Sequence, residues 1–269
     1  MAILAIEGTN CDDELRVALA ALGARPEIVY LKQFEQRDVE PAARRRLADY
    51  QALFVPGGFA AGDYVRAGAI LGARTRASIG PDLEEFVRSG KIVGGVCNGF
   101  QVLVELGLLP GRPGGRLGPP EAALMANDSG HFECRPTFVA WQGGNFPALR
   151  AMAAGTRFLF PSAHAEGKLV LQGDPLARVE ELESDGQVLF RWVAPDGSAA
   201  SYPWNPNGSP GNVAGITNPE GNVFGLMPHP ERSFFRLQSP DWTRDGPPTG
   251  YGDGERFFDA VLSYAERKL

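Results

Sequence analysis

The sequence is poor in cysteine and in histidine, with three residues of each among 269. Three cysteines are an odd number and too few for a disulfide scaffold, so we expect a reducing compartment, the cytoplasm. Cys11, Cys97 and Cys134 also lie far apart in the chain, and no Cys/His spacing is typical of zinc. We therefore expect no metal site.

Basic residues are in the minority, with 26 lysines and arginines against 32 acidic residues and a net charge of −6. This balance argues against a protein that mainly binds nucleic acid. Long apolar runs are also missing, and none approaches the roughly 18 residues of a membrane span. The apolar run at residues 2–6 has no basic segment before it and ends at Glu7, so it is too short for a signal sequence. We expect no membrane association.

The composition is otherwise that of a folded protein, since 43% of the residues are apolar and 22% are charged. No internal repeat occurs, and no stretch is polar enough to mark a linker between domains. We expect a single domain over residues 1–269.

Up to residue 110, short apolar runs alternate with stretches of helical periodicity. This alternation is typical of βα units around a parallel sheet with flanking helices, so the fold class is α/β with a mostly parallel open sheet. Proline at the first helical position and glycine after the last turn mark helix ends. The pattern predicts strands at 3–6, 28–31, 53–55 and 92–96, and helices at 12–22, 81–89 and 100–106.

From about Ala122 onward, short strands are separated by turns rich in Asn, Asp, Gly and Pro, which predicts antiparallel additions to the sheet. A hairpin is expected between strands 213–217 and 223–227. A helix near 254–267 closes the chain. Residues 110–120 and 244–254 are dense in Gly and Pro and are expected to be surface loops.

Cys97 follows the buried strand 92–96 within Gly95-Val96-Cys97-Asn98-Gly99, and a helical pattern comes next. The spacing is that of a nucleophile elbow with cysteine in place of serine. The glycines permit a sharp turn, the helix N-terminus favours a thiolate, and the amide of Asn98 can face a developing oxyanion. The pentapeptide alone is equally consistent with a buried structural cysteine.

A cysteine nucleophile needs a base, and His229 has the best setting among the three histidines. It follows an expected strand within Met227-Pro228-His229-Pro230-Glu231, where Glu231 can orient the imidazole. Without Cys97 the same residues would be a turn histidine and an exposed carboxylate. His164 and Glu166 have the same His-x-Glu spacing and remain a competing pair.

Gly57 and Gly58 also follow an expected strand. Their backbone amides can approach a ligand closely and supply a second oxyanion donor, although two glycines after a strand are often only a turn.

Together these motifs resemble the class I, triad-type glutamine amidotransferases, and more narrowly the glutaminase subunits of phosphoribosylformylglycinamidine synthase in purine biosynthesis. The resemblance runs from about Ile6 to Phe234. It is carried by Gly57-Gly58-Phe59, the run from Gly62 to Ile70, Cys97-Asn98-Gly99-Phe100-Gln101, Asn205-Pro206-Asn207-Gly208-Ser209, and Met227-Pro228-His229-Pro230-Glu231-Arg232.

The resemblance implies a flavodoxin-like glutaminase with Cys97 as nucleophile, His229 as proton carrier and Glu231 as its orienting group. It implies L-glutamine as substrate, with Gly57, Gly58 and Asn98 around the oxyanion and Gln101 as a group that holds glutamine. The Asn205–Ser209 cluster would belong to the site or to the interface with the partner.

The implied partner is a large synthetase subunit, with a possible small third subunit. No cofactor is expected on this chain, whereas ATP and Mg are expected on the synthetase. Two alternatives stay open, namely a free-standing cysteine hydrolase or chaperone on a similar elbow fold, and a catalytically idle assembly subunit.

Overall fold

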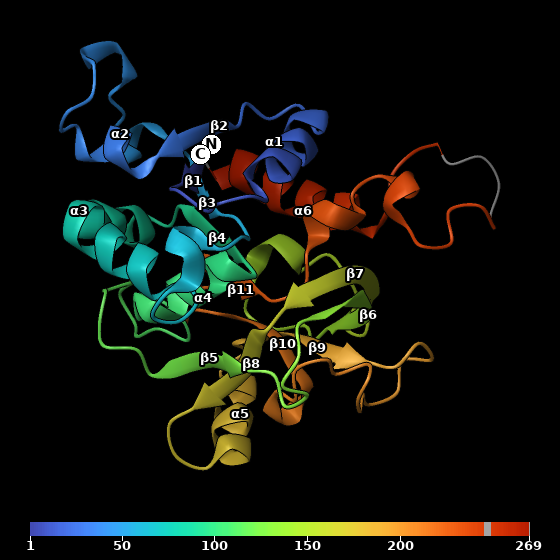
Figure 1. Cartoon of the computed structure of the whole chain (residues 1–269). Coiled ribbons are helices and arrows are strands. Elements are labelled where there is room, and N and C mark those ends of the chain that lie inside the picture. The colour runs from blue at the N-terminus through green and yellow to red at the C-terminus, as the bar shows by residue number, and fades with distance from the viewer. Residues whose placement is uncertain (245–248, 269) are drawn as a thin grey trace.

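The computed structural model describes residues 1–244 and 249–268. Within these residues, a mixed sheet of nine strands runs through the molecule in the order β2-β1-β3-β4-β11-β10-β9-β6-β7 (Figure 1). A separate pair of strands, β5 and β8, lies beside it. The strands are β1 (Ala2–Ala5), β2 (Glu27–Tyr30), β3 (Ala52–Val55), β4 (Ile92–Val96), β5 (Ala122–Ala126), β6 (Glu133–Trp141), β7 (Arg157–His164), β8 (Glu166–Leu171), β9 (Val188–Val193), β10 (Val213–Thr217) and β11 (Val223–Leu226).

One half of the large sheet is parallel. β1 pairs with β2 and β3, β3 pairs with β4, and β4 pairs with β11, all in the same direction. β1, β3, β4 and β11 are buried along their whole length, as expected for parallel strands covered on both faces. The other half, from β11 through β10, β9 and β6 to β7, is antiparallel. The mixed α/β fold expected from the sequence is confirmed.

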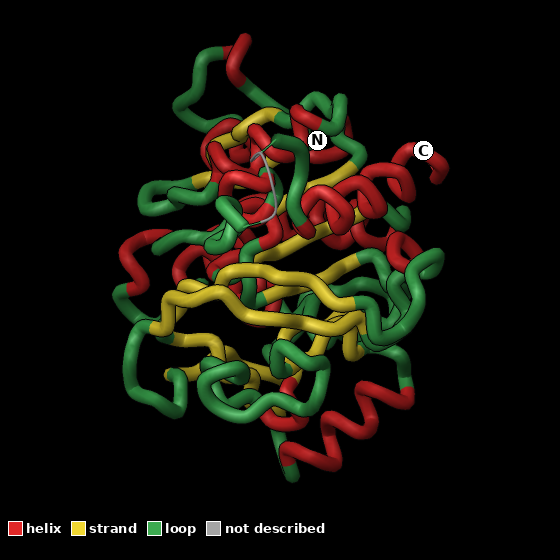
Figure 2. The backbone as a smooth tube through the Cα atoms, turned by 90° about the vertical axis from the view of Figure 1, so that its right-hand side faces the viewer, coloured by secondary structure: helices red, strands yellow, loops and turns green. Residues whose placement is uncertain are grey.

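The helices lie on both faces of the parallel half. α3 and α4 pack together on one face, and α1 and α6 contact each other on the other face (Figure 1). In the view of Figure 2, most of the helical backbone surrounds the parallel strands, and the antiparallel half carries mainly loops. The helices are α1 (Asp12–Ala21), α2 (Leu31–Glu35), α3 (Ala69–Arg88), α4 (Asn98–Glu105), α5 (Pro175–Ser184) and α6 (Asp253–Lys268).

The core under α6 is built from aromatic rings. Phe257 of α6 contacts Phe224 of β11, Phe160 of β7 and Phe190 of β9 edge to face. These strands come from both halves of the sheet, so the rings join the parallel and antiparallel strands in one hydrophobic core.

Most expected elements of the first 110 residues are confirmed to within a few residues. The exception is the helix expected at 81–89, because α3 begins at Ala69 and continues through Pro81. The backbone leaves helical geometry at Ile79, with φ of −131°, two residues before the proline. A proline inside a helix removes one hydrogen bond and crowds the preceding turn, so a kink at this place allows the helix to continue.

In the second half, the hairpin of β10 and β11 and the closing helix are confirmed. The short helix α5 was not expected, although Pro175 at its first position and the Asp174 side chain, which accepts from two backbone amides, are typical of a helix start. Residue 31, expected as the end of a strand, is the first residue of α2.

The expected loop at 110–120 contains no helix or strand. The expected loop at 244–254 falls partly on residues 245–248, which lie outside the described residues, and from Asp253 onward it belongs to α6. Among the described residues, no helix combines the length and the apolar character that crossing a membrane requires.

Candidate active site

The candidate site lies at the carboxyl ends of the adjacent parallel strands β1, β3, β4 and β11. The segments that follow these strands contain Cys11, the pair Gly57 and Gly58, Cys97 and His229, respectively. Parallel strands direct their carboxyl ends to one edge of a sheet, which is where open α/β sheets commonly bind ligands. The fold therefore brings together residues that are far apart in the chain.

Cys97 occupies a strained turn between β4 and α4. Its φ is +51° and its ψ is −108°, a conformation that non-glycine residues rarely adopt and that costs about 1–3 kcal/mol. The turn needs glycine on both sides, because a Cβ on Gly99 would lie 1.8 Å from the Val55 carbonyl oxygen and one on Gly95 would lie 2.6 Å from the Gly99 oxygen. The elbow expected from the sequence is present.

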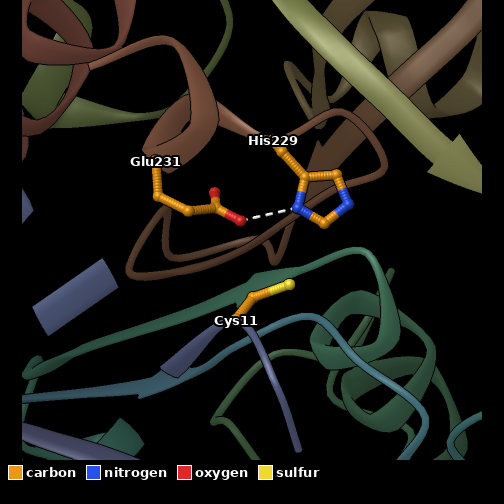
Figure 3. Close-up of side chains that lie close together, drawn as sticks. All are labelled: Cys11, His229 and Glu231. Atoms are coloured by element: carbon orange, nitrogen blue, oxygen red, sulfur yellow. Dashed lines mark hydrogen bonds and ion pairs between the residues drawn. The ribbon is translucent and has the colours of Figure 1, made fainter. Parts of the chain in front are cut away.

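His229 lies directly after β11 and is held by a hydrogen bond from its backbone N–H to the Pro161 carbonyl, at 2.8 Å. Its Nδ1 atom is 2.6 Å from Oε1 of Glu231, and both side chains are buried (Figure 3). His229 Nε2 and Glu231 Oε2 are buried without a hydrogen-bond partner among the described residues. The imidazole therefore has one nitrogen fixed by Glu231 and the other available.

Burial by itself disfavours a charged imidazole at His229. The Glu231 carboxylate, aided by the Cys97 and Cys11 thiols, outweighs this effect and holds the pKa of His229 well above its ordinary value. The protonated form of the histidine is accordingly favoured by its contact with the buried carboxylate. A charged histidine next to a cysteine is a typical setting for a reactive thiol.

Cys97 and His229 line one cavity with a volume of about 160 Å³. Gly58, Asp63 and Glu166 also line it. Burial and the charge of Glu166 raise the pKa of Asp63 above its usual range. The cavity thus combines thiol and imidazole groups with two carboxyl groups.

The glycine loop after β3 lies between the thiols and the histidine. A Cβ on Gly57 would be 2.7 Å from His229 Cε1, 3.1 Å from Cys11 Sγ and 3.4 Å from Cys97 Cβ, so only glycine fits there. Gly58 has φ of +142° and pairs with Thr9 in an isolated β-bridge. The structure thus places Gly57 beside the two cysteines and the histidine, and Gly58 lines the same cavity.

The side chains of Asn98 and Gln101 are engaged with the protein. Asn98 Nδ2 donates to Gln101 Oε1 at 2.9 Å and to Asp63 Oδ1 at 3.3 Å, and its Oδ1 accepts from the Ala60 N–H. Gln101 Nε2 donates to the Glu166 carbonyl at 2.5 Å. Both side chains therefore tie α4 to the loops around the cavity, and Gln101 also lines the cavity.

His164 lies in the same cavity but is not paired with Glu166. The Glu166 carboxylate instead accepts from the Ala67 N–H at 3.1 Å, whereas His164 Nε2 is 3.2 Å from Asn207 Nδ2. Burial, aided by the charge of His229, lowers the pKa of His164 to about 3. His164 is therefore neutral at physiological pH and lacks the orienting carboxylate that His229 has.

The cluster from Asn205 to Ser209 contacts His164 through Asn207. Asn207 Oδ1 accepts from the Ser209 hydroxyl at 2.7 Å, and Asn205 Nδ2 donates to the Ser209 carbonyl at 3.1 Å. The Ser209 hydroxyl also accepts from the Leu169 N–H in β8. The cluster thus holds His164 in position. It therefore lies at the candidate site, which is one of the two locations that the sequence suggested for the cluster.

The sequence matches the family described as "CobB/CobQ-like glutamine amidotransferase domain" over residues 1–265. The chain belongs to this glutamine amidotransferase family. Curated relatives support a narrower kinship. The "phosphoribosylformylglycinamidine synthase subunit PurQ" of Archaeoglobus fulgidus is 46% identical over 99% of this chain and 97% of the relative, and that of Picrophilus torridus is 41% identical over 95% and 94%. The resemblance seen in the sequence is confirmed.

Solved structures of glutamine amidotransferases share the fold. A chain of the "PurLQS" structure from Thermotoga maritima superposes with a TM-score of 0.70 at 31% identity, covering 98% of this chain and 97% of that one. A putative GMP synthase component of Thermoplasma acidophilum gives 0.53 at 14% identity, covering 99% of this chain and 96% of that one, which shows a common fold only.

Sequence reasoning missed Cys11 as a residue of the candidate site, although it lies close to His229 and Glu231. Arg232 donates from its guanidinium to Cys11 Sγ at 3.1 Å, and burial raises the pKa of the Cys11 thiol. Figure 3 shows Cys11 with its sulfur directed toward the imidazole of His229. The usable signal was its position in the segment between the first parallel strand and the first helix, which lies at the edge where the other site residues gather.

Proposed function

We propose that this chain is the glutaminase subunit of a phosphoribosylformylglycinamidine synthase. The observation that carries the proposal is that Cys97, on its strained elbow, lines one cavity with His229, whose imidazole contacts the buried Glu231. The family and the PurQ relatives, matched over almost the whole chain, support the specific enzyme.

In this proposal the sulfur of Cys97 attacks the γ-carboxamide carbon of L-glutamine. The negative charge on the carbonyl oxygen is held by the backbone amides of Gly58 and Asn98. His229 gives its proton to the departing ammonia, and Glu231 keeps the imidazole oriented. Water then hydrolyses the thioester and releases glutamate.

Cys97, rather than Cys11, is the proposed nucleophile, although both cysteines immediately precede a helix. The first turn of α4 carries no acidic residue, whereas that of α1 carries three, which weaken the positive end of its helix dipole. Cys97 is also next to Asn98, whose backbone amide is a proposed oxyanion donor. Cys11 has no comparable elbow, and burial raises the pKa of its thiol. Cys11 takes no part in the proposed glutaminase chemistry.

Glutamine is held by the polar groups of the same cavity. Gln101 is one proposed contact, because it lines the cavity one turn of α4 beyond Cys97. Because its amide already bonds Asn98 and Glu166, its role is to offer a fixed dipole rather than a free side chain.

The ammonia passes to a synthetase subunit that carries ATP and Mg. There it converts formylglycinamide ribonucleotide to the amidine, and a small third subunit completes the assembly. The Thermotoga maritima label "PurLQS" supports a complex of this kind. The chain itself needs no cofactor for the proposed steps.

Glutaminase turnover should depend on the partner, because ammonia released without an acceptor wastes glutamine. The test measures glutamate release by the purified chain alone and by the chain with its synthetase partner, the ribonucleotide substrate and ATP. We expect slow turnover alone and a large increase in the assembly, through repositioning of the loop at Gly57 and Gly58. Full turnover by the isolated chain, unchanged by the partner, would favour a free-standing hydrolase.

A further inference from the structure

We propose that Cys11, His229 and Glu231 form an inhibitory binding site for a thiophilic divalent cation of the zinc class. The inhibition, though not the binding, rests on the proposed glutaminase function.

The three side chains have the geometry that such an ion requires. One potential ligand atom from each residue lies within 4.8 Å of those of the other two, and all three residues are buried. Thiolate sulfur, imidazole nitrogen and carboxylate oxygen are the ligands that zinc takes in proteins. Tetrahedral zinc places such atoms roughly 3.5 Å apart, so small side-chain movements close the site around an ion.

Glu231 carries a buried polar atom without a partner. Its Oε2 atom has no hydrogen-bond partner among the described residues, while its Oε1 atom lies 2.6 Å from His229 Nδ1. A buried polar atom without a partner is costly, which indicates that Oε2 meets a ligand at some stage, and an ion shared with Glu231 binds on the Nδ1 side of the imidazole. Because His229 lines the cavity, an ion held by three protein ligands has an open fourth position for water.

Burial raises the pKa of the Cys11 thiol, and the positive charge of Arg232 offsets part of this effect when an ion binds. The guanidinium of Arg232, 221 residues further along the chain, donates to Cys11 Sγ at 3.1 Å. Arg232 also lies 3.6 Å from Glu14 of α1, so it has a second anion to contact when the thiolate turns to the metal. The divalent ion, the thiolate and the carboxylate together carry no net charge, which suits a buried site.

An ion at this site stops the proposed reaction without touching the nucleophile. Coordination at Nδ1 takes the place of the proton and of the Glu231 contact on that nitrogen, so the charged imidazole that gives its proton to the departing ammonia no longer forms. Removal of the ion allows the imidazole of His229 to carry its proton again. Cys97 is not needed as a ligand, which separates this site from simple metal capture by the catalytic thiol.

The binding test titrates the full chain with Zn²⁺ in competition with a chromophoric chelator. We expect one tight site per chain, weakened at least about 100-fold by Cys11→Ser, since even partners of metal ligands contribute 10–100-fold. Cys97→Ser should retain the site. Cys134→Ser is the matched control, because Cys134 is an exposed free cysteine outside the cluster. Co²⁺ in the wild-type and Cys97→Ser chains should show a thiolate-to-metal charge-transfer band, which reports ligation independently of the folding of Cys11→Ser.

The activity test measures the ratio of glutaminase turnover with and without Zn²⁺ in the assembled enzyme, for each protein separately. Wild type should be inhibited and then restored by a chelator, while Cys11→Ser resists. Equal zinc affinity in wild type and Cys11→Ser, or loss of the site in Cys134→Ser, would overturn the proposal. Zinc binding through Cys11 in a chain without glutaminase activity would reject the proposed function alone, and an active chain without the zinc site would reject only this inference.

Discussion

The Nδ1 atom of His229 lies 2.6 Å from Oε1 of Glu231 within the buried edge of the sheet. This contact fixes the orientation of the ring and raises the pKa of the histidine against the cost of burial. It leaves Nε2 as the nitrogen available for chemistry.

Glu231→Gln should lower glutaminase kcat about 10²–10⁴-fold in the assembled enzyme, because the neutral amide neither stabilises the imidazolium nor enforces its tautomer. The pKa of His229 should fall in the same variant. Glu14→Gln is the matched control, since it removes a carboxylate near Arg232 without touching the histidine. A Glu231→Gln enzyme with kcat close to wild type would refute the role of the pair.

The two histidines of the cavity should differ in thioester formation. His229→Ala should slow acylation of Cys97 by glutamine at least about 10²-fold, whereas His164→Ala should acylate and act mainly on coupling to the synthetase. Rapid-quench trapping of the glutamyl thioester measures both rates. Blocked acylation in His164→Ala together with normal acylation in His229→Ala would reverse the assignment.

His164 should make the fold sensitive to acid. Its pKa is about 3 in the folded chain and roughly 6.5 when unfolded, so the unfolded state binds more protons between these values. The free energy of unfolding therefore falls with decreasing pH, by up to about 1.4 kcal/mol per unit below pH 6.5. Urea unfolding of His164→Gln should lack this contribution, about 2 kcal/mol at pH 5. An identical pH dependence in wild type and variant would contradict the burial of a neutral histidine.

The raised pKa of His229 changes the free energy of unfolding with pH in the opposite direction. Its contribution to stability is fully present below about pH 6.5 and is lost as pH rises through the folded pKa. His164→Gln should therefore lose only the fall in stability at acid pH and keep the fall in stability at higher pH. This result distinguishes the contribution of His164 from that of His229.

Gly58→Ala should lower kcat about 10²-fold by displacing the proposed oxyanion donor. Its φ is +142°, and a Cβ there would lie 2.5 Å from Asn10 Oδ1 and 2.8 Å from the Asn10 nitrogen. Gly23→Ala is the control, because Gly23 also has positive φ but a Cβ there meets nothing within 4 Å. Steady-state kinetics and thermal unfolding of both variants separate a local effect from a loss of stability. Equal kcat values in the two variants would show that the loop at Gly58 takes no part in the mechanism.

The sequence predicted the parts of this structure that depend on local pattern. Buried strands followed by glycine turns predicted the edge of the sheet at which the candidate site lies, and the Gly-x-Cys-x-Gly spacing predicted the elbow at Cys97. Pro81 was misread as a helix start because proline is common at that position, whereas the kink at Ile79 lets α3 continue. The single domain over residues 1–269 stays a prediction.

Contacts between distant segments could not be read from spacing. Cys11 approaches His229 only because β1, β3, β4 and β11 are neighbours in the sheet, an order that no local motif encodes. The competing pair of His164 and Glu166 has the same spacing as His229 and Glu231, and only the fold directs Glu166 to the Ala67 amide instead.

The central claim is that Cys97 releases ammonia from glutamine for a synthetase partner. The most direct measurement compares glutamine-supported with ammonia-supported amidine synthesis by the complex assembled with Cys97→Ala. We predict that synthesis from glutamine is abolished and that synthesis from ammonia stays near the wild-type rate, because the synthetase site remains intact. Glutamine-supported synthesis that survives in Cys97→Ala would contradict the claim.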